Sequence, residues 1–74
     1  MWSKGAFEVD MVLVEYHVKH FEEGSKFGID KGRISKLDII ADSEILACYD
    51  RNWIIEPRTD IARKALQKIL AEYN

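Results

Sequence analysis

The sequence is poor in cysteine, proline and histidine. Its 74 residues include one cysteine, Cys48, one proline, Pro57, and two histidines. A single cysteine cannot form an internal disulfide, which excludes the disulfide framework of small secreted domains. His17 and His20 lie three apart on a strand-like segment, so their side chains point to opposite faces and cannot share a metal ion. We therefore expect neither a metal site nor a cofactor.

Long apolar runs and a large net charge are also missing. No run approaches the roughly 18 residues of a membrane-spanning helix, and the first residues lack the basic and apolar regions of a signal peptide. The formal net charge is −2 and the pI about 5.6, so no overall field attracts nucleic acid. These features predict a cytoplasmic protein that does not associate with membranes.

The composition is that of a small folded domain. Hydrophobic residues make up 47% of the chain and charged residues 32%, which is typical of a globular protein and not of a disordered one. We expect residues 1–74 to form one domain. A chain this short buries only about 60% of its unfolded surface, so its stability should be modest.

Alternating residues predict two strands near the N-terminus. Residues Val12–Lys19 alternate between two faces over eight positions, as in a half-buried antiparallel strand. Residues Trp2–Val9 form a weaker strand candidate, interrupted by Gly5. Asp10 is the turn-prone residue between them, which predicts a tight hairpin.

The segment Glu22–Gly32 is predicted to be a loop, either rigid or mobile in the isolated protein. Gly24, Gly28 and Gly32 recur at every fourth position, and three glycines would cost a helix about 1 kcal/mol each. Glycines in a loop favour turns with positive φ. We expect Phe27 and Ile29 to tuck their side chains beneath this loop.

Two further strands follow the loop. Residues Arg33–Ala41 form the first, with a bulge near Ser35-Lys36 because the apolar positions do not alternate strictly. After a turn at Asp42-Ser43, residues Glu44–Tyr49 form the second, with Ile45, Ala47 and Tyr49 on one side. Asp50-Arg51-Asn52 is a turn. Residues Trp53–Ile55 either continue the sheet or form a segment that covers it.

The last element is an amphipathic helix. Thr59 is the expected N-cap, and Asp60 complements the helix dipole in the first turn. Apolar residues follow with helical spacing: Ile61, Ala62, Ala65, Leu66, Ile69, Leu70 and Tyr73. The predicted fold is α+β, a four-stranded, mainly antiparallel sheet with one C-terminal helix packed on one face, in the order β-β-loop-β-β-α.

The opposite face of such a sheet has no helix to cover it. Leu13, together with Phe7 or Trp2, should therefore be partly exposed. An exposed apolar patch on so small a domain favours a protein partner or a homodimer.

The residues capable of chemistry do not form a recognisable catalytic motif. Cys48 is either a nucleophile with His17 or His20 as its base or a small core residue. Glu22, Glu23 and Asp30 fit solvated loop carboxylates. Residues Gly28–Lys36 resemble a phosphate-binding loop in composition, but the P-loop spacing fails and a strand follows instead of a helix. We expect no enzymatic activity.

Two clusters are candidates for contact with a partner. The loop supplies Phe27, Lys31, Arg33 and Lys36, and the sequence YDRNW supplies Tyr49, Arg51 and Trp53. Aromatic residues and arginine dominate binding hot spots, although Trp53 could equally anchor the core. The first functional hypothesis is a non-enzymatic protein-interaction module that uses these seven residues.

The alternative hypothesis is a nucleic-acid-binding module. Its phosphate contacts would be Lys26, Lys31, Arg33, Lys36 and Arg51, with an aromatic residue such as Phe27 or Trp53 stacking on bases. This hypothesis requires the five cations to share one face, and the acidic pI is unfavourable to it.

The same motifs carry a resemblance. SKFGIDKGRISKL (Ser25–Leu37), then YDRNW, Pro57 and a helix ending in Tyr73-Asn74 resemble a group of small uncharacterised proteins of Firmicutes bacteria and their phages. The group has glycine where this chain has Asn52, so the turn after Arg51 departs from the pattern. The resemblance implies a prophage or mobile-element setting and no particular activity.

Overall fold

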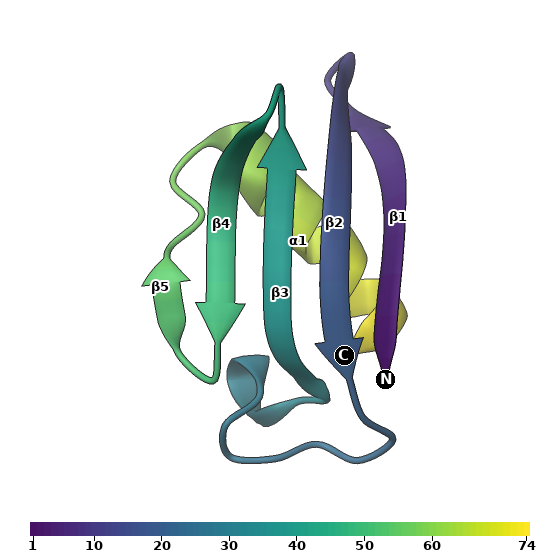
Figure 1. Cartoon of the computed structure of the whole chain (residues 1–74), viewed down its shortest axis with the longest axis vertical. Helices are drawn as coiled ribbons and strands as arrows, with labels where there is room; N and C mark the ends of the chain where they lie inside the picture. Colours follow the sequence, from purple (N-terminus) through teal and green to yellow (C-terminus); the bar gives the residue numbers. More distant parts are fainter.

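A meander of five antiparallel strands forms one sheet, and a single α-helix covers one of its faces. The computed structural model describes residues 1–74, and its elements follow in chain order: β1 (Trp2–Val9), β2 (Val12–His20), the 3₁₀ turn η1 (Ile29–Lys31), β3 (Ile34–Ala41), β4 (Glu44–Asp50), β5 (Trp53–Ile55) and α1 (Asp60–Tyr73). The strand order is β1-β2-β3-β4-β5. Figure 1 shows α1 crossing behind the sheet from the β4 side to the β1 side.

The α+β class, the antiparallel sheet and the C-terminal helix are confirmed, but the prediction of four strands is wrong. Trp53–Ile55 forms a fifth strand, in which Trp53 pairs with Tyr49 and Ile55 with Cys48. Three residues are too few to show an alternating pattern. The segment is a strand because it pairs with the free edge of β4. The local sequence does not reveal that this edge is available.

Two-residue turns close both long hairpins. Asp10 and Met11 have φ of 49° and 68°, and Asp42 and Ser43 have φ of 51° and 62°. Two consecutive positive φ values are the signature of a type I′ turn, whose twist matches that of the flanking strands. The predicted hairpin at Asp10 and the turn at Asp42-Ser43 are both confirmed.

Bulges set which side chains face the helix. Lys19 pairs with Lys36 and His20 with Ile34, so Ser35 is an extra residue and the bulge predicted there is confirmed. A second bulge was missed: Ile39 pairs with Ala47 but Ile40 with Ile45, which makes Leu46 the extra residue. Ile45 therefore points to the face opposite Ala47 and Tyr49, and its predicted placement beside them is wrong.

The core lies between the sheet and α1. Its fully buried larger side chains are Val14, Val18, Ile34, Leu37, Ile39 and Ile69. Thr59 caps the helix as predicted, its Oγ1 accepting a hydrogen bond from the Ala62 amide at 3.1 Å. Ala62, Ala65 and Ile69 are the buried residues of α1. With 14 residues, α1 is too short to cross a bilayer.

The glycines of the loop provide space, not positive φ. No glycine has a positive φ, whereas Asp30 and Lys31 have φ of 52° and 59°. A Cβ on Gly28 would collide with the carbonyl of Gly32, and a Cβ on Gly32 would collide with the Asn74 amide. The prediction of glycine turns with positive φ is therefore wrong, since close backbone approach is what requires these glycines.

The two apolar loop residues differ in their placement. Ile29 is buried at 3% exposure, as predicted, but Phe27 is 55% exposed, so its predicted place beneath the loop is wrong. Phe27 directly precedes the buried backbone of Gly28, and its side chain is left on the outer side of the loop.

No helix covers the second face of the sheet, as expected. This open face carries Leu13 and Trp2, each 56% exposed. Phe7, the other residue expected there, lies instead on the helix side, where its ring packs 5.6 Å from Tyr16 and 4.9 Å from the Lys68 ammonium.

Candidate functional site

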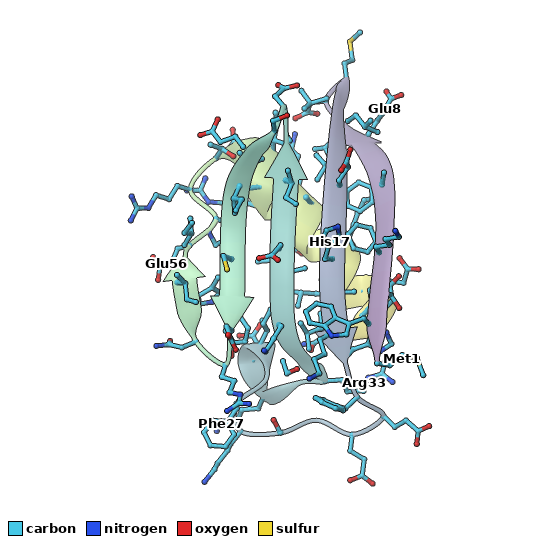
Figure 2. The ribbon with its side chains drawn as sticks, in the orientation of Figure 1. Met1, Glu8, His17, Phe27, Arg33 and Glu56 are labelled. Carbon is cyan, nitrogen blue, oxygen red and sulfur yellow. The ribbon has the colours of Figure 1, made fainter.

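The loop and the turn between β4 and β5 meet at one end of the sheet. The Arg51 amide donates to the Ser35 carbonyl at 3.0 Å, which joins this turn to the start of β3. We call this region the loop end, comprising residues 21–35 and 50–53. Figure 2 shows Phe27 and Arg33 there, at the opposite end of the molecule from Glu8.

Tyr49 and Trp53 support the loop from beneath. The Tyr49 hydroxyl donates to the Phe27 carbonyl at 2.7 Å, and the Trp53 ring packs edge-on against Tyr49 with 5.0 Å between ring centres. Tyr49 is only 7% exposed, and burial, together with the nearby Asp30 carboxylate, raises its pKa. Among the seven predicted contact residues, Tyr49 is therefore a buried anchor, and Trp53 is half-buried.

Asn74 ties the loop to the helix. Its Nδ2 donates to the Ile29 carbonyl at 3.1 Å, and its Oδ1 accepts from the Ile34 amide at 3.0 Å. The Asn74 amide itself donates to Leu70. Sequence reasoning missed this residue, although the spacing of Gly28 and Gly32 was a signal that something approaches the loop backbone closely.

The exposed part of the loop end combines one aromatic ring with free cations. Lys26, Lys31, Arg33 and Arg51 are exposed and none takes part in an ion pair, whereas Lys36 lies 3.9 Å from Asp50. The Lys26 ammonium lies 5.2 Å from the centre of the Phe27 ring. Glu22, Glu23 and Asp30 are exposed in the same segment, so the surface is of mixed charge.

A family model described as "Domain of unknown function (DUF7678)" matches residues 1–74. The chain belongs to the DUF7678 family. The match spans every strand and α1, so the family's domain coincides with the sheet and its helix. No curated protein and no solved structure matches the chain.

A row of polar side chains crosses the open face of this DUF7678 domain. Lys4, His17, Asp38 and Cys48 stand opposite one another on four successive strands. Trp2, Ser3, Lys4, His17 and Asp38 line a depression of about 430 Å³ there. Figure 2 shows His17 on this face.

The position of Cys48 next to Asp38 in this row disfavours a reactive thiol. Burial raises the pKa of the Cys48 thiol, and hydrogen bonding to Asp38 raises it further. A nucleophilic cysteine needs a positive neighbourhood that lowers its pKa, but here a carboxylate lies between the thiol and His17.

The two histidines lie on opposite faces, as predicted. On the helix side, the His20 Nε2 is hydrogen-bonded to the Ser3 hydroxyl at 3.0 Å, and its ring lies 4.9 Å from Tyr73. His17 lies on the open face. No group of three or more His, Cys, Asp or Glu side chains in this domain could hold a metal ion.

Proposed function

We propose that this DUF7678 domain is a non-enzymatic protein-interaction module whose contact surface is the loop end. The observation that carries the proposal is an exposed aromatic ring, Phe27, at the same end of the sheet as four exposed cations that form no ion pair. Tyr49 and Asn74 anchor the loop that carries this ring. A loop that is ordered before binding loses less entropy on association than a mobile one.

The chemistry of the loop end favours a particular kind of partner. Arg33 and Arg51 can each bind a carboxylate through two parallel hydrogen bonds, and the Phe27 ring offers apolar contact. The partner we propose is a protein segment with acidic residues next to an apolar side chain. We place the interaction in the cytoplasm and, from the resemblance to phage-encoded proteins, in a prophage or phage setting.

The non-enzymatic part of the proposal is supported by the environment of Cys48. Burial and the neighbouring Asp38 raise the pKa of the thiol, the reverse of nucleophile activation. An alkylation rate of Cys48 in the folded protein above that of the denatured chain would contradict this assignment.

Affinity capture from host lysate, with and without nuclease, tests the interaction. The variant Arg33→Ala/Arg51→Ala removes the two loop-end arginines. The matched control Arg58→Ala/Arg63→Ala removes two exposed arginines outside the loop end. We expect the wild type and the control variant to capture the same nuclease-resistant protein, and the loop-end variant to lose it while keeping its circular dichroism spectrum. Capture that is equal for all three proteins would contradict the proposal.

A second candidate function is nucleic-acid binding through the same end. It is favoured by the absence of ion pairs at Lys26, Lys31, Arg33 and Arg51, which with Lys36 belong to one end of the sheet. Binding of this kind weakens steeply with salt. Titration of single- and double-stranded oligonucleotides at low ionic strength tests it, and the absence of any salt-dependent binding would rule it out.

A further inference from the structure

The two edges of the sheet differ in how they are protected. The outer edge, β5, has three residues, an irregular register against β4 and Pro57 shortly after it. Short strands, bulges and proline are the devices that keep an edge from pairing with other chains. By contrast, β1 has eight residues, pairs with β2 in unbroken register and contains no proline. The β1 edge is therefore open to another strand.

The alternation of hydrogen bonds identifies which groups point outward. Met1 and His20 exchange hydrogen bonds through both of their backbone groups, and antiparallel pairs alternate between bonded and non-bonded. Ser3, Gly5, Phe7 and Val9 therefore bond to β2. The backbone groups of Trp2, Lys4, Ala6 and Glu8 point away from the sheet, and no hydrogen bond within the chain occupies them.

The strand and the helix at this edge each carry one cation and one anion near a small residue. Lys4 and Glu8 flank Ala6 on β1, and all three are exposed. Behind the strand, Lys68 and Glu72 flank Ala71 on α1, and they line with Ala6, Phe7 and Tyr16 an open groove of about 600 Å³. None of the four charged side chains belongs to an ion pair within the molecule.

We propose that the β1 edge binds a second copy of this chain, forming a homodimer with a continuous ten-stranded sheet. The two β1 strands run antiparallel around a two-fold axis at Ala6. Ala6 then lies opposite its own copy, and Lys4 lies opposite Glu8 of the second copy on both sides of the axis. Opposite charges in this position stabilise a strand pair.

The register follows from the charges and the side-chain sizes. A pairing centred on Lys4 or on Glu8 would place like charges opposite each other, and one centred on Gly5 would leave both charges without a partner. One centred on Phe7 would place Lys4 opposite Asp10, which lies beyond the end of β1 and is already bonded to Lys64. Centring on Ala6 also places Phe7 of each copy beside Gly5 of the other. Gly5 has no side chain, and the Tyr16 ring of the same chain already lies against it, so Gly5 itself presents no side chain that would obstruct the incoming Phe7.

The helices fit the same axis. Lys68 lies at the level of Phe7, 4.9 Å from its ring. Glu72 lines the same groove as Tyr16, the residue paired with Gly5. A two-fold axis at Ala6 exchanges these two levels, so Lys68 of one copy faces Glu72 of the other. The edge strand and the helix thus have the same self-complementary pattern, which favours a second copy over an unrelated strand.

Sedimentation equilibrium on the purified chain tests the dimer, because a monomer has a mass of 8.6 kDa and a dimer twice that mass. We expect Ala6→Pro to give a monomer with an unchanged fold, since proline removes an outward amide that β2 does not use. We expect Glu8→Lys to raise the dimer dissociation constant by about tenfold or more, because two attractive contacts become repulsive.

A charge reversal provides the matched control. Lys4→Glu/Glu8→Lys restores the symmetric pairing and should dimerise like the wild type, whereas Glu44→Lys, exposed on β4 away from the β1 edge, should change nothing. In the wild type, the amides of Trp2, Lys4, Ala6 and Glu8 should exchange with solvent more slowly as the protein concentration rises.

A wild-type chain that stays monomeric at millimolar concentration would overturn the proposal, as would a dimer unaffected by Ala6→Pro and Glu8→Lys. The proposed dimer contacts at Lys4, Ala6 and Glu8 do not include Arg33 or Arg51, so either result leaves the proposed interaction at these arginines to be judged independently.

Discussion

At the scale of single residues, Asn74 connects three parts of the molecule. Its side chain satisfies a carbonyl in the loop and an amide at the start of β3, while its backbone extends the hydrogen bonding of α1. Gly32 leaves the space that this side chain occupies. Gly28, Gly32 and Asn74, which lies more than forty positions further along the chain, therefore fix the loop backbone together.

We expect Asn74→Ala to lower the free energy of unfolding by about 2 kcal/mol, because it leaves one partly buried donor and one acceptor without partners. Asn74→Asp keeps the acceptor for the Ile34 amide, but it sets a carboxylate oxygen against the Ile29 carbonyl at the C-terminal end of α1, so it should also destabilise the fold. Urea denaturation followed by tryptophan fluorescence measures both. Equal stability of the alanine variant and the wild type would show that Asn74 does not anchor the loop.

Tyr16 makes the stability sensitive to alkaline pH. Its hydrogen bond to the Tyr73 hydroxyl and its burial raise its pKa from 10.0 to about 12. Because the folded pKa exceeds the unfolded one, the stabilisation is complete below pH 10.0 and is lost as the pH rises toward 12. Burial also raises the pKa values of Tyr49 and Cys48, so these groups act in the same direction.

We therefore expect the urea midpoint to fall steadily between about pH 10 and pH 12. Tyr16→Phe should make this fall shallower, and so should Tyr73→Phe, which removes the hydrogen-bond partner. A midpoint that is constant over this range, or a fall unchanged in both variants, would be inconsistent with this role of Tyr16.

At the scale of elements, the two hairpin turns contain a removable strain. Met11 and Ser43 hold φ of 68° and 62°, which costs a non-glycine residue on the order of 1 kcal/mol. We expect Met11→Gly and Ser43→Gly each to stabilise the fold by roughly 0.5–1 kcal/mol, since Asp-Gly is a preferred pair for a type I′ turn. Thermal unfolding measures the gain, and destabilisation by both variants would refute it.

The elements also show which parts of the fold were predictable from sequence. Val12–Lys19 and the helix from Thr59 onward have strong periodicity over eight or more residues, and the structure confirms both. The bulge at Leu46 and the short strand β5 have no local signature, because each depends on how a neighbouring strand pairs. The missed bulge at Leu46 is why Ile45 was assigned to the wrong face, whereas for Trp53–Ile55 a strand was one of the two alternatives left open.

The residues predicted to contact a partner differ in their exposure. The cations Lys31, Arg33 and Arg51 are exposed at the loop end as a contact surface requires, but Tyr49 is buried beneath the loop. From the sequence alone, a buried tyrosine that donates to a backbone carbonyl cannot be told from an exposed aromatic residue in a binding hot spot. What distinguishes them is a tertiary contact: the Tyr49 hydroxyl lies 2.7 Å from the Phe27 carbonyl.

At the scale of the whole molecule, the fold has one covered face, one open face and two unequal edges. The loop end presents an aromatic ring and cations, and the β1 edge presents free backbone groups and symmetric charges. The two surfaces are separate, so a dimer formed through β1 would present two loop ends. Such a dimer would bind a repeated or dimeric partner more tightly than the monomer would.

The central claim is that the loop end is ordered before any partner binds. Amide hydrogen exchange tests it directly, because the loop contains both bonded and free amides. The amides of Ser25, Gly28, Lys31 and Gly32 donate to carbonyls within the loop, whereas those of Glu22 and Glu23 donate no hydrogen bond. We expect slow exchange at the first four, fast exchange at the two glutamates, and loss of the difference in Asn74→Ala. Fast exchange at all six amides in the wild type would contradict the account.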